Sequence, residues 1–181
     1  DDMMDNFGFM QNHSFSVSGG SERTSYRMGL GYTGEDGILI TDKDKFNRVN
    51  FSSFISVDVN KWLTTQLDVR YANSNQYKVE QGGRNGVWGS AMALPSYQNI
   101  SHYEVDGITY PAETSATYVR YGEPRNIKKT DMRVLGRVII SPLKGLKITG
   151  EYTYNRTTKY NKFYANKYQY VGFNFTGILN S

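Results

Sequence analysis

Residues 63–71 of the chain read Leu63-Thr64-Thr65-Gln66-Leu67-Asp68-Val69-Arg70-Tyr71. The odd-numbered positions are apolar or uncharged, and the even-numbered positions are polar or charged. Successive side chains of a β-strand point to opposite faces of a sheet. This segment therefore predicts a strand with one uncharged face and one charged face.

The same alternation predicts six strands, near residues 13–19, 25–34, 46–58, 63–73, 131–141 and 146–156. One face, which runs from Phe15 and Val17 to Tyr152 and Tyr154, carries no charge. The other face holds these charged residues: Arg27, Arg48, Asp58, Asp68, Arg70, Asp131, Arg133, Arg137, Lys147 and Glu151. Such a sheet either covers a protein core or faces lipid from a closed barrel.

The connections between these strands alternate between short and long. Gly19–Thr24, Val59–Trp62 and Pro142–Gly145 are short turns, whereas residues 34–45 and a long outer loop, 74–130, make the other connections. Short turns at one end of a sheet and long loops at the other are typical of outer-membrane barrels. The fold class that we expect is all-β, an antiparallel transmembrane β-barrel segment.

Aromatic residues are expected at both borders of the uncharged face. Tyr32, Tyr71, Tyr152 and Tyr154 fall near the long-loop ends of their predicted strands, and Trp62 lies at a short turn. Rings with one polar edge collect at membrane–water interfaces. This placement favours lipid on the uncharged face.

The composition excludes several classes of function. Cysteine is absent, so the chain can form no disulfide, thiolate metal site or Cys nucleophile. The net charge of +4 is spread along the strands and is not gathered on one helix, so no nucleic-acid partner is expected. No stretch approaches the roughly 20 consecutive apolar residues of a membrane-spanning helix.

Two runs of the sequence carry a resemblance to a known family. The first reads His13-Ser14-Phe15-Ser16-Val17-Ser18-Gly19-Gly20-Ser21-Glu22-Arg23-Thr24-Ser25-Tyr26 and is followed by Gly29-Leu30-Gly31-Tyr32 and Glu35–Leu39. The second reads Phe46-Asn47-Arg48-Val49-Asn50-Phe51 and continues through Val59–Leu63 to Leu67–Val69. They resemble the barrel of SusC/RagA-type TonB-dependent transporters over about residues 11–75, and residues 131–156 resemble it more loosely.

The resemblance implies a bacterial outer-membrane barrel of about 22 strands with a plugged lumen. It also implies a SusD-like surface lipoprotein as lid, contact with TonB through N-terminal parts, and import of an oligosaccharide or peptide substrate. The chain departs from this pattern because it contains no plug domain and too few strands. We therefore expect residues 1–181 to be part of a single β-barrel domain.

Two other architectures fit the same alternation. In a soluble β-sandwich binding module, a second sheet would cover the uncharged face. In a small self-contained barrel of about eight strands, residues 5–12 and 164–176 would supply the missing strands. Phe9 and Tyr170 would then lie on adjacent strands.

Carboxylates on the charged face suggest acid–base chemistry, but their neighbours argue against it. Arg48, Arg70, Arg133 and Lys147 are expected on the same face as Asp58, Asp68, Asp131 and Glu151. A hydrolase pair requires one isolated carboxyl with a raised pKa. We therefore predict a ladder of cross-strand ion pairs, no enzymatic activity, no cofactor and no metal site.

The long loop supplies the candidate ligand contacts. Trp88, Tyr97 and Tyr103 are the aromatic residues that we select, because rings stack on sugars and cap peptides. Packing onto neighbouring loops or a lid protein is the alternative role. Within this loop, residues 86–94 predict a short helix, and 103–110 predict a hairpin with an Asp-Gly turn.

Overall fold

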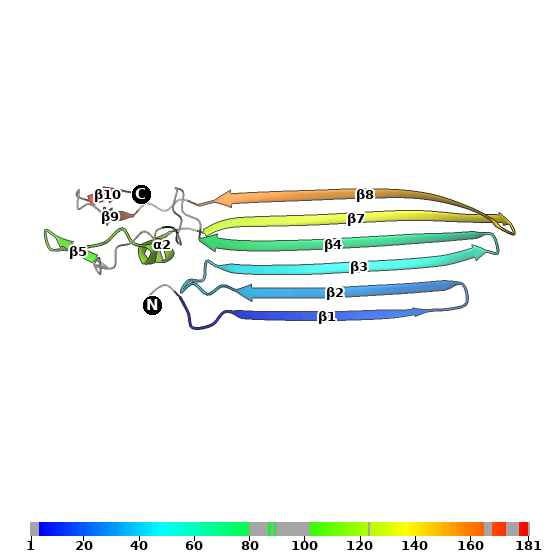
Figure 1. Ribbon diagram of the computed structural model, residues 1–181, viewed down its shortest axis with the longest axis horizontal. Helices are drawn as coiled ribbons and strands as arrows, with labels where there is room; N and C mark the ends of the chain where they lie inside the picture. The colour runs from blue at the N-terminus through cyan, green and yellow to red at the C-terminus, as the bar shows by residue number, and fades with distance from the viewer. Residues whose placement is uncertain are drawn as a thin grey trace.

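A computed structural model of the chain describes residues 4–79, 87, 89, 102–122, 124–164, 168–172 and 178–180. The fold is all-β, and its main element is one antiparallel sheet with the strand order β1-β2-β3-β4-β7-β8 (Figure 1). These strands are β1 (Phe9–Gly20), β2 (Thr24–Asp36), β3 (Lys45–Asn60), β4 (Leu63–Val79), β7 (Pro124–Leu143) and β8 (Leu146–Phe163). The predicted antiparallel sheet of six strands is confirmed.

The strands extend further toward the long loops than the sequence predicts. β4 continues to Val79 and β7 begins at Pro124, so the long connection spans 80–123 and the predicted bounds of 74–130 are wrong. Polar residues occupy both faces beyond Tyr71 (for example Asn73 and Ser74), which ends the alternation of apolar and polar side chains. Backbone pairing does not depend on that alternation and continues.

The short connections lie together at one end of the sheet, and the long connections lie at the other (Figure 1). The short ones are residues 21–23, 61–62 and 144–145. Gly145 has a φ of 89°, a left-handed conformation that glycine adopts without a steric penalty. The predicted asymmetry between turns and loops is therefore present.

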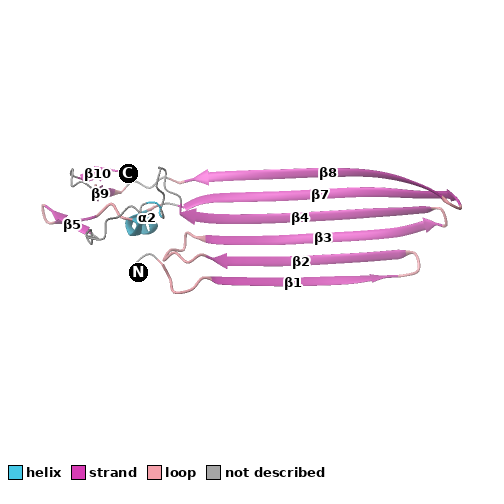
Figure 2. Ribbon diagram, in the orientation of Figure 1, coloured by secondary structure: helices cyan, strands magenta, loops and turns pink. Residues whose placement is uncertain are grey.

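Small elements gather at the long-loop end (Figure 2). They are β5 (His102–Val105), β6 (Ile108–Pro111), α2 (Ser115–Tyr121), β9 (Gln169–Val171) and β10 (Ile178–Asn180). Asp106 and Gly107, with φ values of 53° and 77°, form the turn between β5 and β6, as predicted. Of the helix predicted over residues 86–94, only Val87 and Gly89 lie within the described residues, and both are helical.

A small apolar core holds this loop region together. Val119 is 1% exposed and packs with Leu39, Val87 and Tyr118. Thr114 caps α2, because its side-chain oxygen accepts a hydrogen bond from the Thr117 backbone amide at 3.3 Å.

The main sheet is open along both edges within the described residues. β1 pairs only with β2, β8 pairs only with β7, and β9 pairs with β10. Phe9 therefore lies opposite Asp36, and Tyr170 lies opposite Leu179. This pairing differs from that of the self-contained small barrel, in which Phe9 and Tyr170 would lie on adjacent strands.

The register brings the uncharged positions together on one face. Leu30 lies opposite Phe51, Phe51 opposite Tyr71, and Tyr71 opposite Met132. The side chains on this face are open: Val49 is 46% exposed and Leu67 is 43% exposed. No second layer of described residues covers this face, in contrast to the β-sandwich alternative.

Candidate functional site

The charged face of the sheet carries both basic and acidic side chains. Register and alternation place these basic residues on it: Arg27, Arg48, Arg70, Lys78, Arg125, Lys129, Arg133, Arg137, Lys147 and Lys159. The same face carries half as many acidic residues, namely Glu35, Asp58, Asp68, Asp131 and Glu151. The face therefore has an excess of positive charge.

One ion pair on this face crosses between strands. Arg137 of β7 binds Glu151 of β8, with its Nε at 2.8 Å and its Nη2 at 2.6 Å from the same carboxylate oxygen. Arg137 also donates a hydrogen bond to the Gln66 side-chain oxygen at 3.3 Å. These contacts link β4, β7 and β8.

Two further ion pairs on this face run along a strand. Arg70 binds both carboxylate oxygens of Asp68, at 3.0 Å and 3.2 Å. Lys129 binds Asp131 at 2.9 Å. The prediction of a cross-strand ladder is therefore only partly correct, because long side chains two positions apart on the same face also reach each other.

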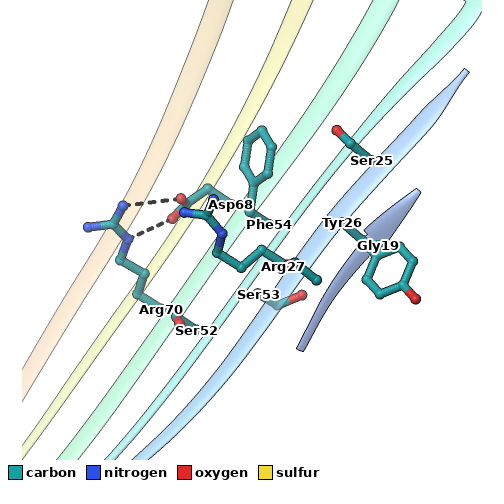
Figure 3. Close-up of a pocket in the computed structure, with 10 residues that line it drawn as sticks. Gly19, Ser25, Tyr26, Arg27, Ser52, Ser53, Phe54, Asp68 and Arg70 are labelled. Atoms are coloured by element: carbon teal, nitrogen blue, oxygen red, sulfur yellow. Dashed lines mark hydrogen bonds and ion pairs between the residues drawn. The ribbon is translucent and has the colours of Figure 1, made fainter. Parts of the chain in front are cut away.

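A groove of about 840 Å³ lies on this face over β1 to β4. Arg27, Phe54, Asp68 and Arg70 line it together with small serine side chains (Figure 3). In Figure 3 the side chains of Arg27 and Arg70 flank Asp68, and Phe54 stands beside them. Phe54 lies directly between Arg27 and Asp68 in the register and supplies an apolar wall.

A second groove, of about 450 Å³, continues over β3, β4, β7 and β8. Arg48, Arg70 and Arg133 line it, together with Asn155 and Thr157. Arg70 lines both grooves, so the two adjoin. Together they form a basic surface that crosses the polar face.

Four carboxylates of the polar face, those of Asp58, Asp68, Asp131 and Glu151, have side-chain partners. Asp58 accepts a hydrogen bond from Thr64 at 2.6 Å, and Asp131 accepts one from Thr157 at 2.7 Å. Among the described residues, no group of three or more His, Asp or Glu side chains is arranged to hold a metal ion.

The uncharged face ends in polar residues along an oblique border. The row of paired residues through Tyr32 reaches β4 at Asn73, and Tyr71 lies two residues nearer the turns. The row through Tyr71 reaches β8 at Arg156, and Tyr154 again lies two residues nearer the turns. The tyrosine that borders the uncharged stretch therefore moves by about one residue per strand, and Tyr77 and Tyr160 lie on the same face farther toward the long loops.

The border near the turns is oblique in the same sense. The row through Tyr26 reaches β4 at Leu67, but the apolar face of β4 continues to Leu63. The row through Leu63 reaches β8 at Ile148, and the apolar face of β8 continues to Leu146. The uncharged area is therefore a band that crosses the strands diagonally.

The slope of this band has a simple geometric meaning. A shift of one residue, about 3.3 Å, for each strand spacing of about 4.8 Å corresponds to an angle of about 35°. Tyr71, Tyr152 and Tyr154 were predicted at the long-loop ends of their strands, but β4 continues to Val79 and β8 continues to Phe163. Tyr152 lies opposite Gly136, one position inside Tyr154 on the same face.

Only one of the predicted ligand contacts falls within the described residues. Trp88 and Tyr97 lie outside them. Tyr103 lies in β5 opposite Tyr110 and is half-buried. The role of these three rings as ligand contacts therefore stays a prediction.

A row of three tyrosines lies in the loop region. The ring centroids of Tyr121 and Tyr168 are 5.7 Å apart, and those of Tyr168 and Tyr170 are also 5.7 Å apart. Burial, together with Tyr170 and Glu113 nearby, raises the pKa of Tyr168 to about 12. From the sequence, residues 164–176 were considered only as a strand of a small barrel, and the contact of Tyr168 with Tyr121 of α2 was not identified.

The basic grooves were also missed at the level of the sequence, because only the presence of a cation beside each carboxylate was considered. Alternation correctly placed Arg70 and Arg133 on one face. Their direct opposition depends on the register between β4 and β7, across the long connection. No sequence signal fixes that register.

Comparisons with known proteins add no family assignment. No protein-family model matches the chain, and a search of curated proteins finds no match. The described residues include no helix that is long and apolar enough to span a membrane.

Proposed function

We propose that this chain is a segment of an outer-membrane β-barrel that imports a nutrient, a glycan or a peptide, in a TonB-dependent manner. The observation that carries the proposal is the exposed, uncharged and oblique band. In an outer-membrane barrel the strands cross the bilayer at about 35–45°, so the border with lipid must cross them diagonally. The slope of about 35° between Tyr32, Tyr71 and Tyr154 fits that tilt.

The width of the band agrees with the same proposal. From Leu63 to Tyr71 the face of β4 is uncharged, a path of about 27 Å along the strand. At a tilt of about 40° this path spans roughly 20 Å of membrane thickness, close to the apolar height of about 25 Å of outer-membrane barrels. Directly beyond Tyr71 the same face turns polar at Asn73 and Asn75, as a segment above the membrane would.

The open edges of the sheet and its polar face support a larger assembly. Unpaired strand edges do not occur in lipid, so β1 and β8 require further strands as neighbours in a membrane. A wet lumen accommodates the basic grooves on the opposite face. By the sequence resemblance, the partners are outer-membrane lipid, a SusD-like surface lipoprotein and TonB, and the location is the cell outer membrane.

Spin labels test the environment of each face directly. The chain has no native cysteine, so a single introduced cysteine carries the only label. Leu67→Cys places the label on the uncharged face, and Gln66→Cys places it on the polar face at the neighbouring position. In outer-membrane vesicles we expect oxygen, which dissolves in lipid, to relax the label at position 67 more than a water-soluble nickel complex does.

The label at position 66 is the matched control and should show the reverse preference. A label at Val138, on β7, should behave like the one at 67. If both reagents are excluded at 67 and 138, protein covers the band and the soluble sandwich replaces the transporter. That alternative also predicts a monomer that is soluble without detergent.

A further inference from the structure

Cations face each other directly on the polar side of the sheet. Arg70 lies opposite Arg133, and Lys129 lies opposite Lys159. In the described strands of this sheet, no acidic residue lies opposite another acidic residue. Like charges at opposed positions destabilise a sheet, so this arrangement carries a cost that a bound anion would offset.

The Arg70–Arg133 pair is the centre of this positive region. Arg70 is bound to Asp68 through both carboxylate oxygens. Within the described part of the chain, Arg133 makes no hydrogen bond or ion pair, and its side chain is exposed. The Asp68 carboxylate is therefore paired with Arg70, and Arg133 has no carboxylate partner among the described residues.

Arg48 brings a third guanidinium to the same groove. It lies on β3 and donates a hydrogen bond from its Nε to the Asn50 side-chain oxygen at 2.7 Å, which leaves its two terminal nitrogens available. The carboxylate in this groove, Asp131, is bound to Lys129 and to Thr157. The groove is thus short of negative charge.

We propose that the groove lined by Arg48, Arg70 and Arg133 binds a carboxylate group of the imported substrate. The proposal rests on the proposed function and deepens it, because it assigns an acidic class to the substrate. Guanidinium groups hold carboxylates with two parallel hydrogen bonds. The groove volume of about 450 Å³ lies within the range of small-ligand sites.

The adjoining groove extends the site to an oligomer. Arg70 and Ser52 line both grooves, and Arg27 lines the larger one of about 840 Å³. Arg27 likewise makes no ion pair with any residue that the structure describes. A chain with repeated carboxylates, either an acidic oligosaccharide or an acidic peptide, meets a succession of cations along this surface.

Binding to the intact protein in detergent micelles tests the inference by titration calorimetry. The probes are trigalacturonate, triglutamate and the neutral maltotriose. Arg133→Gln should weaken the binding of trigalacturonate by roughly tenfold or more, because a charge-assisted pair is lost. Triglutamate tests whether acidic peptides share the site, and binding of either acidic probe with this Arg133 dependence supports the proposal.

Lys147→Gln is the matched control. It removes the same charge from the same face, but Lys147 lines neither groove. Arg133→Lys keeps the positive charge but cannot donate two parallel hydrogen bonds to a carboxylate, so the affinity of this variant should lie between those of the wild type and Arg133→Gln. Equal losses of affinity in Arg133→Gln and Lys147→Gln, or equal affinity for maltotriose and trigalacturonate, would overturn the inference.

The spin labels separate this inference from the proposed function. If position 67 faces lipid and neither acidic probe depends on Arg133, the anion site is wrong and the barrel stands. If position 67 is covered by protein, the barrel itself is wrong.

Discussion

The substitution Leu67→Arg places a charge at the centre of the uncharged band. On β4 this band runs from Leu63 to Tyr71, and Leu67 lies halfway between them. Its side chain is 43% exposed and lies opposite Ile55 and Gly136. Gly136 has no side chain, so the new arginine finds no carboxylate beside it to neutralise its charge.

The expected loss of stability depends on how deep in the bilayer the new arginine lies. An arginine on the lipid face costs about 2–4 kcal/mol at the bilayer midplane and about 0–1 kcal/mol near an interface. Asn73→Arg is the matched control, because Asn73 lies on the same strand and face but beyond Tyr71. We therefore expect the two variants to differ by about 2–3 kcal/mol in the free energy of unfolding.

Unfolding by guanidinium chloride in phospholipid vesicles measures this difference, with the intrinsic fluorescence of Trp62 and Trp88 as the signal. Retarded mobility on unheated gels reports whether each variant has folded. Equal free energies of unfolding for Leu67→Arg and Asn73→Arg would refute the reasoning, because no gradient of depth would exist along β4. A Leu67→Arg variant that folds only without lipid would point to a covered, soluble sheet.

Three further predictions concern local features. Gly145→Ala should lower stability by about 1 kcal/mol because of the φ of 89°, whereas Gly150→Ala should be neutral in the same unfolding assay, since nothing lies within 4 Å of its added carbon. A double-mutant cycle on Arg137 and Glu151 should give a coupling of about 0.5 kcal/mol, because their side chains are 39% and 41% exposed; a coupling near 3 kcal/mol would indicate burial. The carbon-13 resonance of the Tyr168 ring should titrate near pH 12, and titration near pH 10 would contradict the burial of the ring. The stability that the protonated Tyr168 hydroxyl contributes should be complete below about pH 10 and should be lost as the pH rises through 12.

The faces and the connections could be predicted because they depend on local sequence. Alternation with a period of two assigns each side chain to a face without knowledge of its neighbours, and glycine at Gly145 marks a tight turn. The ends of the strands depend on pairing between backbones. Residues 72–79 and 124–130 pair although their side chains show no alternation of apolar and polar residues, so these ends were missed.

The candidate site depends on register, which is not a local property. Lys147 was expected beside Glu151, but the partner of Glu151 is Arg137, across the β7–β8 turn. Arg70 and Arg133 are separated by the long connection, and a shift of two residues in pairing would remove their opposition. The basic groove could therefore not be predicted from residue spacing.

The register also determines how the tyrosines are arranged across the sheet. In sequence, Tyr32, Tyr71 and Tyr154 each lie near the end of a predicted strand, and they suggested a belt level with the strand ends. Once the strands are paired, the same rings form a line that crosses the sheet at about 35°. A belt perpendicular to the strands would require untilted strands, which outer-membrane barrels do not have. The diagonal is therefore a stronger argument for lipid contact than the presence of the rings alone, because the spacing of the rings along each strand and the pairing between strands contribute to it independently.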